Sequence, residues 1–326
     1  MEKRTNKNRV TLGLLLLLLL VIIVVCIYSM LDVGKTEEKY HISVILDESS
    51  SLRWAAMKEG LEQAAQDNQI ELNIVSTAKM ADLKEEKKII DSELDRGADG
   101  IVLQMVSSID AMDVLETFDG RTDIVLLEND VEPGDMYSII GSNDYEMGKT
   151  LGESVIEKQG RSIQNKTIGV LVGNQNQLTF QQILLGLKEG LGAYNTQISW
   201  EINSTGNVTS QLEQNQLEAP ADILITLGNN ETELGIDFFL NSEDQTMDFY
   251  GIGCSDKTIY YLDQGMLDSM VVPNEFNIGY LSIEKLSQQL QYKTKKTEDI
   301  EVDYLIIDKD NLYDKDNQKV LFPIVQ

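Results

Sequence analysis

Apolar runs alternate with helical patterns along most of this chain. The first apolar run, His41–Leu46, is followed by a polar turn at Asp47–Ser51. Apolar residues then recur at helical spacing from Trp54 to Ala64, and a second apolar run occupies Ile70–Val75. The two runs predict buried strands, and the segment between them predicts an amphipathic helix. A strand, crossover helix and strand of this length form a parallel βαβ unit with a right-handed connection.

The same alternation continues through two further series of elements. After a helical pattern at Leu83–Leu94, the first series has predicted strands at Ile101–Met105, Asp123–Leu127 and Tyr137–Ile140, with a helix at Ile109–Phe118. The second series has predicted strands at Thr167–Val172, Gln197–Ile202, Ile223–Leu227, Asp248–Ile252, Ser269–Val272 and Tyr304–Ile307. Its helices are predicted at Thr179–Leu191, Val208–Leu217, Thr232–Leu240 and Glu275–Gln291, with a further one through Leu262. This order predicts an α/β chain with two doubly wound parallel-sheet lobes.

The strand ends are the places where a binding site is expected. Ligands of open parallel sheets bind beyond the carboxyl ends of the strands. Asp47–Trp54 follows the first strand in this position, and two α/β lobes of similar plan predict a ligand cleft between them.

A long apolar segment near the start of the chain predicts one transmembrane helix. The run extends over residues 12–31, which is long enough to cross a bilayer. The basic residues of 1–11 precede it, so the amino end is expected in the cytoplasm and the rest of the chain outside. A cleaved signal peptide and a lipoprotein signal at Cys26 are the alternatives. A retained anchor is favoured, because no small-x-small cleavage site follows the run and two valines precede the cysteine. Residues 32–39 then form a polar tether.

Charge and residue inventory exclude several classes of function. The 326 residues hold 54 Asp and Glu against 27 Lys and Arg, a formal net charge of −27. Nucleic-acid binding is not expected, because that affinity rests on Lys and Arg that neutralise phosphates. His41 is the one histidine and there are two cysteines, so Ser–His, Cys–His and multi-histidine metal sites are nearly excluded. No catalytic residue, metal or cofactor is expected.

Seven short motifs occur in order between residue 41 and the end of the chain. They are AMKEG at 56–60, RGADGIVL at 96–103, GSNDYEMG at 141–148, GIG at 251–253, DQG at 263–265, PNEFNIG at 273–279 and IIDKDNL at 306–312. In their order and spacing the chain resembles the type I periplasmic binding proteins, the sugar-binding, ribose-binding-like group. The resemblance implies the fold of that family and an activity of binding rather than catalysis.

The resemblance also implies a hinge of three chain crossings. They are expected near Ser142–Asn143, Pro273–Asn274 and Asp303–Tyr304. The expected extents are 40–142 with 274–303 for lobe 1, and 143–273 with 304–326 for lobe 2. Such proteins close around a ligand that contacts both lobes, so that binding shifts the population from open to closed.

Ten ligand-binding positions follow from the resemblance. They are Ser51, Arg53, Trp54, Gln104, Glu128 and Asn129 in lobe 1, Gln181, Asn229 and Gly253 in lobe 2, and Asn274 at a crossing. Several depart from the family pattern: Glu128-Asn129 stands in place of Asp-Arg, and Gly253 stands in place of an aspartate that grips sugar hydroxyls. These substitutions argue against a ribose-type ligand.

Three of these positions have two interpretations each. Trp54 could stack on the face of a sugar ring, or belong to the core, because it begins the apolar helix face. Arg53 is hypothesised to pair with Glu128 as the charged floor of the cleft, and the alternative is a solvated residue at a helix start. The Glu128 carboxylate can accept two sugar hydroxyls, whereas a polar turn after a strand is its structural alternative.

The sequence therefore predicts a membrane-anchored solute-binding protein that captures a small polar ligand, a sugar, between two lobes. Its expected partner is the permease of an ABC importer. The alternative is a ligand sensor that partners a membrane histidine kinase, which a retained anchor favours. The expected location is the cell membrane, with a single pass and an extracytoplasmic carboxyl-terminal domain.

Overall fold

The computed structural model describes residues 17–24, 39–47, 49, 54–128, 136–192, 197–242, 246–293 and 298–322. The chain divides into two units, Met1–Lys39 and Tyr40–Gln326. In the first unit, residues 17–24 are helical with exposed side chains. No helix among the described residues has the length and hydropathy needed to cross a membrane. The remainder of the predicted span, 12–16 and 25–31, lies outside the described residues, as does Cys26.

The first of two six-stranded sheets in the second unit is wholly parallel. Its strand order is β11-β5-β4-β3-β1-β2. The strands are β1 (His41–Ile45), β2 (Glu71–Ile74), β3 (Gly100–Leu103), β4 (Asp123–Leu127), β5 (Ser138–Gly141) and β11 (Ile300–Glu301). Apart from β2 and the short β11, these strands have almost continuous buried runs, as expected where helices cover both faces of a parallel sheet.

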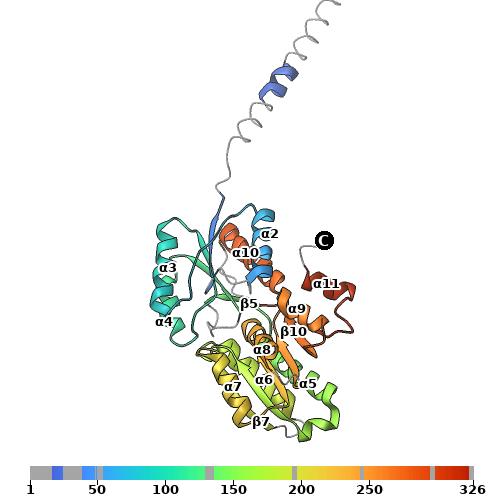
Figure 1. Ribbon diagram of the computed structural model, residues 1–326. Coiled ribbons are helices and arrows are strands. Elements are labelled where there is room, and N and C mark those ends of the chain that lie inside the picture. Colours follow the sequence, from blue (N-terminus) through green and yellow to red (C-terminus); the bar gives the residue numbers. More distant parts are fainter. Residues whose placement is uncertain are drawn as a thin grey trace, which may run out of the picture. The chain divides into compact units, whose positions relative to one another are not determined.

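Helices cover both faces of this sheet. One face packs on α2 (Ala55–Asp67) and α10 (Glu275–Tyr292), which lie side by side (Figure 1). The other face packs on α3 (Leu83–Asp95) and α4 (Ala111–Leu115). The contact between α2 and α10 depends on glycine, because a Cβ at Gly60 would overlap the carbonyl oxygen of Phe276. We call this body lobe 1.

The second sheet has five parallel strands and one antiparallel edge strand. Its order is β12-β10-β9-β8-β6-β7, and β12 pairs with β10 in the antiparallel sense. The strands are β6 (Thr167–Val172), β7 (Gln197–Asn203), β8 (Ile223–Leu227), β9 (Asp248–Ile252), β10 (Ser269–Pro273) and β12 (Tyr304–Ile307). Alternate residues of these strands enter two separate hydrophobic cores, one on each face. We call this body lobe 2.

Six helices among the described residues contribute to the two cores of lobe 2. One core contains α5 (Asp144–Gln159) and α6 (Leu178–Leu191), which pack tightly through glycines on both helices. The other contains α7 (Val208–Glu218), α8 (Asn229–Asn241) and α9 (Asp256–Asp263). Near the carboxyl end, α11 (Lys315–Leu321) adds Leu321 to this second core.

The chain passes between the two sheets three times. It leaves β5 for α5 after Gly141, leaves β10 for α10 after Pro273, and leaves β11 for β12 after Glu301. Helix α10 packs on the first sheet although both β10 and β12 belong to the second. The prediction of an α/β chain with two parallel-sheet lobes is confirmed.

Candidate functional site

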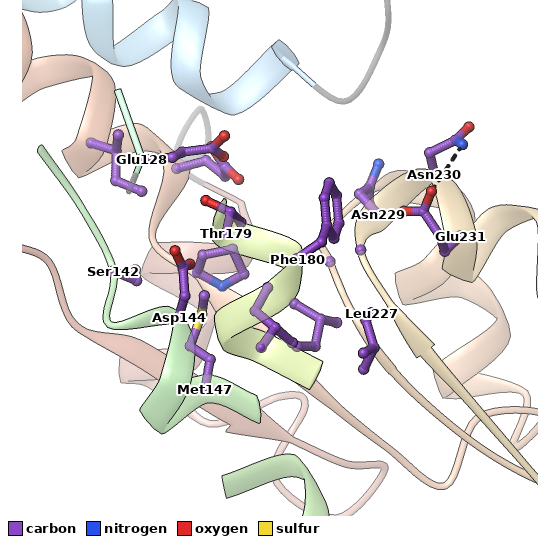
Figure 2. A pocket seen from close by; sticks show the side chains of 17 residues that line it. Glu128, Ser142, Asp144, Met147, Thr179, Phe180, Leu227, Asn229, Asn230 and Glu231 are labelled. Atoms are coloured by element: carbon purple, nitrogen blue, oxygen red, sulfur yellow. Dashed lines mark hydrogen bonds between the residues drawn. The ribbon is translucent and has the colours of Figure 1, made fainter. Parts of the chain in front are cut away.

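A pocket opens where the strand ends of the two lobes face each other (Figure 2). It encloses about 650 Å³ of space, part of which is continuous with solvent. Lobe 1 contributes Glu128 after β4, Ser142 after β5, and Glu275 and Ile278 on α10. Lobe 2 contributes the starts of its helices and the residues after its strands: Asp144, Met147, Thr179, Phe180, Ile183, Leu227, Gly228, Asn229, Asn230, Glu231, Ile252, Gly253 and Pro273.

Glu128 holds an unusual backbone conformation at the lobe 1 side of the pocket. Its φ of 59° lies in the left-handed region, which a non-glycine residue adopts at a cost of roughly 1–2 kcal/mol. The Glu128 amide donates to the carbonyl of Ile140 at 2.8 Å, which ties this turn to β5. An ideal Cβ at Gly141 would lie 2.8 Å from the Cα of Glu128, so only glycine fits beside it. Strain of this kind is characteristic of functional sites.

Asn229 and Gly253 meet at the lobe 2 side. Asn229 opens α8, and its side-chain oxygen is buried without a hydrogen-bond partner among the described residues. Gly253 has a φ of 140°, and a Cβ there would lie 2.6 Å from the Cα of Asn229. The glycine at position 253 therefore allows the backbone to lie close to Asn229. An aspartate at position 253 would overlap Asn229.

Thr179 and Phe180 line the pocket from the first turn of α6 (Figure 2). The Thr179 hydroxyl is buried without a hydrogen-bond partner among the described residues, and the side chain is 8% exposed. The Phe180 ring is held against two glycines, since a Cβ on Gly173 would overlap it and one on Gly228 would come within 3.0 Å of its edge. The pocket therefore has an aromatic surface beside polar groups, the usual mixture of a small-molecule site.

Carboxylates are the commonest polar group of the pocket. Four line it: Glu128, Asp144, Glu231 and Glu275. Glu231 is 3% exposed and accepts hydrogen bonds from the Ser204 hydroxyl at 2.6 Å and from the Asn230 amide at 3.4 Å. Near the pocket, burial and the charges of Glu275 and Asp256 raise the pKa of the Cys254 thiol to about 12.

The lobes also meet at a second set of contacts, between the loop after β3 and the loop before α6. Ser108 donates its amide to the Asn176 carbonyl at 3.0 Å, and its hydroxyl accepts from the Leu178 amide at 2.8 Å. The Gln177 side-chain amide donates to the Met105 carbonyl at 3.1 Å. These three hydrogen bonds hold the two lobes together at a point outside the pocket lining.

A buried carboxyl supports the lobe 1 side of these contacts. Glu86 on α3 is fully buried and accepts a hydrogen bond from the Val106 amide at 3.0 Å. Burial raises its pKa to about 8, the Val106 hydrogen bond opposes the shift, and the charge of Asp47 adds to it. The carboxyl is therefore protonated at neutral pH.

The structure brings three of the ten predicted positions together in the pocket: Glu128, Asn229 and Gly253. Asn274 lies between two lining residues, but its side chain caps α10 by accepting from the Asn277 amide at 3.1 Å. Gln104 is buried at the end of β3 and does not line the pocket. Ser51, Arg53 and Asn129 lie outside the described residues.

Trp54 and Gln181 need correction. Trp54 is fully buried in the core between α2 and the first sheet, and its indole N–H donates to the Asp47 carbonyl at 3.0 Å. No face of the ring is open to a sugar, so the core interpretation is the right one. Gln181 is exposed on α6 and donates to the Gln175 carbonyl at 2.8 Å. The pocket is lined instead by Phe180, one residue earlier, whose ring turns toward the cleft.

Six polar lining residues among the described residues were not predicted from the sequence: Ser142, Asp144, Thr179, Asn230, Glu231 and Glu275. A signal for them existed, because each follows a strand or lies in the first turn of the helix after one. Acidic residues are common in the first turn of any helix, because they interact favourably with the positive end of the helix dipole. This signal therefore does not distinguish a ligand-binding residue from one that stabilises the helix.

The match to a known family is extensive. The model of the periplasmic binding protein domain matches residues 42–294. The chain belongs to the periplasmic binding protein family. Its fold relatives are type I sugar-binding proteins, as the resemblance predicted. Members of this family bind and transport sugars without catalysis, which agrees with the expectation that the chain is not an enzyme.

Solved structures of the same fold share little sequence with this chain. GanP, a glucose–galactose binding protein from Geobacillus stearothermophilus, is 17% identical with a TM-score of 0.75, over 85% of this chain and 100% of GanP. A solute-binding protein from Burkholderia graminis in complex with D-arabinose is 15% identical with a TM-score of 0.77, over 86% and 99%. A chain of the XylFII–LytSN complex is 14% identical with a TM-score of 0.69, over 83% and 98%. No curated protein matches the sequence. These likenesses establish the fold alone.

Proposed function

We propose that this protein binds a small sugar-like ligand between its two lobes and closes around it. The observation that carries the proposal is a single pocket lined from both sheets, with Glu128 and Glu275 on one side and Asn229 and Phe180 on the other. A ligand that touches both walls stabilises the arrangement in which the walls are close, so binding and hinge closure are linked. The three hydrogen bonds between the 105–108 and 176–178 segments add to the stability of that arrangement.

The chemistry of the pocket fits a polyhydroxylated ligand. Carboxylates and amides accept and donate the hydrogen bonds that sugar hydroxyls require. The Phe180 ring offers an apolar surface for the C–H face of a sugar ring. The sequence suggested Trp54 for this role. Phe180, from the opposite lobe, takes that role in the proposal.

A thermal-shift screen with sugars, nucleosides and amino acids tests the ligand class. A ligand that binds only the native state must raise the melting temperature. We expect a rise with at least one sugar or sugar derivative and none with the other two classes. Replacing Asn229 by Ala or Phe180 by Ala is expected to weaken binding about tenfold, because each removes a contact at the pocket wall. Gln214→Ala, an exposed amide on α7, is the matched control. A ligand whose affinity survives both pocket variants binds elsewhere.

We propose that the protein delivers its ligand to an ABC importer. We also propose that the apolar segment 12–31 anchors an extracytoplasmic binding domain to the membrane. Family membership supports the transport role. Deleting the gene is expected to abolish uptake of the radiolabelled ligand, and a variant without residues 1–39 is expected to leave the membrane fraction. The alternative is a sensor role, and the observation that supports it is the likeness to a chain of the XylFII–LytSN complex. If the deletion leaves uptake unchanged but abolishes a ligand-dependent transcriptional response, the sensor role is favoured.

A further inference from the structure

We propose that Ser108 of lobe 1 caps helix α6 of lobe 2, and that this cap holds the first turn of α6 in place for the ligand only while the lobes are closed. The inference rests on the proposed function, because Thr179 and Phe180 in that turn line the cleft. Ser108 lies outside the pocket lining and therefore acts as a positioning residue. Closure of the lobes then strengthens one wall of the pocket through a residue that does not contact the ligand.

The start of α6 lacks a cap from its own segment. The helix begins at Leu178, and the residue at its N-cap position is Gln177. The first N–H groups of a helix have no partner within the helix and are commonly satisfied by the side chain of the N-cap residue. The Gln177 side chain makes no such hydrogen bond within the described part of the chain. Its amide instead donates to the Met105 carbonyl of lobe 1 at 3.1 Å. The residue in position to cap the helix therefore binds the opposite lobe.

Lobe 1 supplies the missing cap. The Ser108 hydroxyl accepts a hydrogen bond from the amide of Leu178, the first residue of α6, at 2.8 Å. A serine hydroxyl is a typical acceptor for the free N–H groups at a helix start, but this serine stands 70 residues earlier in the chain and in the other lobe. By contrast, α7 of lobe 2 is capped from within by Asn207, which accepts from the Ser210 amide. When the lobes separate, the Leu178 amide loses this partner to water, so the cap belongs to the closed arrangement.

Each of the two loops that meet is held within its own lobe. In lobe 1 the Val106 amide donates to the buried carboxyl of Glu86 at 3.0 Å. In lobe 2 the Gln177 amide donates to the Asn174 carbonyl at 2.9 Å, and the Asn174 side chain accepts from the Asn176 amide at 3.0 Å. Loops that are already ordered lose little conformational freedom when they meet. The hydrogen bond of the cap therefore contributes to closure with little loss to ordering.

The capped turn carries part of the pocket wall. The two residues after Leu178 are Thr179 and Phe180, and both line the pocket (Figure 2). Thr179 is 8% exposed, and its hydroxyl has no hydrogen-bond partner among the described residues. Buried polar groups are normally satisfied, so this hydroxyl indicates a group that a ligand completes. The cap from lobe 1 and the ligand therefore stabilise the same helical turn, and each favours the arrangement that the other requires.

The expected size of the effect follows from the cost of losing a helix cap. Replacement of a capping serine by alanine changes the equilibrium that forms the cap by about fivefold. Here that equilibrium is closure of the lobes, so the ratio of closed to open molecules is expected to fall by about fivefold in Ser108→Ala. The same factor applies to the protein with and without ligand, because the cap is part of the closed arrangement in both.

Hydrogen–deuterium exchange of the ligand-free full chain, measured by mass spectrometry with single-residue fragmentation, tests the cap without any ligand. The amide at position 108 donates to the Asn176 carbonyl across the lobes, whereas the Val106 amide donates to Glu86 within lobe 1. In Ser108→Ala we expect exchange at position 108 to accelerate about fivefold and exchange at Val106 to stay unchanged. Ser108→Thr keeps the hydroxyl and is expected to retain the wild-type rate.

The exchange experiment has a matched control and two results that overturn the cap. Ser107→Ala removes a hydroxyl of the same loop that accepts from the Ile109 amide within lobe 1. It is expected to leave the ratio of the exchange rates at position 108 and Val106 unchanged. Equal acceleration at both amides in Ser108→Ala means that the loop itself has loosened, and it overturns a cap between the lobes. An unchanged rate at position 108 overturns it as well.

The dissociation rate of a bound sugar tests the link to the pocket. D-glucose, D-galactose and D-arabinose are the probes, and their release is followed by stopped-flow displacement. A ligand enclosed by both lobes leaves only after they open, so Ser108→Ala is expected to release it about fivefold faster than wild type, and Ser108→Thr at the wild-type rate. Release that Ser108→Ala leaves unchanged overturns the positioning role and leaves sugar binding intact. If none of the three sugars binds to the wild type, sugar binding fails and the positioning role fails with it, whereas faster exchange at position 108 alone still supports the cap.

Discussion

The buried carboxyl of Glu86 makes a prediction about stability and pH. Glu86 is fully buried beneath the loop after β3, which contacts lobe 2, and burial raises its pKa from 4.5 to about 8. In the unfolded chain this carboxyl ionises at its ordinary pKa. Between these two values the folded state keeps a proton that the unfolded state has released, so this group lowers stability as the pH rises from about 4.5 to about 8. Replacing Glu86 by Gln removes the titrating group and keeps an acceptor for the Val106 amide.

The size of the effect follows from the shift in pKa. Each pKa unit corresponds to roughly 1.4 kcal/mol. At pH 7 the penalty for keeping Glu86 protonated is about 3 kcal/mol, and at pH 5 it is about 1 kcal/mol. The free energy of unfolding of the Glu86→Gln variant, relative to wild type, is therefore expected to rise by about 2 kcal/mol from pH 5 to pH 7. Any cost of packing the amide is the same at both values and cancels from this difference.

Thermal or urea melts of both proteins at pH 5, 6, 7 and 8 measure this difference. Glu157→Gln, at an exposed position on α5, is the matched control and is expected to show no such trend. The reasoning would be refuted if the difference in free energy of unfolding between Glu86→Gln and wild type stayed constant across this pH range. A constant difference would mean that the carboxyl has the same charge in the folded and unfolded states. The result bears on function, since Glu86 supports the segment whose Met105 and Ser108 contact lobe 2.

Three further predictions concern single residues. Gly186→Ala is expected to lower the free energy of unfolding by about 1–3 kcal/mol, because a Cβ there would overlap the carbonyl oxygen of Tyr145 in the α5–α6 contact. Urea melts measure this loss, with Gly192→Ala at an exposed glycine as the control. Gln69→Gly is expected to raise the free energy of unfolding by up to about 1 kcal/mol, since Gln69, the residue after the C-cap of α2, has a φ of 55°. An unchanged or lower value would contradict this. Cys254 is expected to react slowly with thiol reagents at pH 8 in the native protein and rapidly in denaturant, because burial and neighbouring carboxylates raise its thiol pKa to about 12. Fast native labelling would contradict that account.

The sequence pattern predicts most strands well, for a physical reason. Strands such as β6 and β8 are buried on both faces and therefore appear as short continuous apolar runs, which match their observed bounds. Helix α5 was not predicted. Its buried positions include Gly148, Gly152 and Ser154, small residues that allow close contact with α6 but give a weak apolar pattern. The two-residue strand β11 is too short to produce any pattern.

The binding site could be predicted only in part. Position along the chain indicates Glu128 and Asn229, which both line the pocket, because each follows a strand of a parallel sheet, and such strand ends meet at one edge. It does not indicate which way a side chain turns. Trp54 lies at the expected turn yet points into the core, and Phe180 rather than Gln181 faces the cleft, a difference of one residue in a helix. The charge of the pocket arises from carboxylates on four separate elements, and only the fold brings them together.

The central claim is that a ligand bridges the two lobes and closes the hinge, and small-angle X-ray scattering measures this most directly. The radius of gyration is compared without ligand and with a saturating concentration of the tightest ligand from the thermal-shift screen, with calorimetry establishing occupancy in the same buffer. The account predicts a smaller radius of gyration on binding, and no change in the Asn229→Ala variant at a ligand concentration that saturates only the wild type. A ligand that binds stoichiometrically while the radius of gyration stays constant would contradict the account.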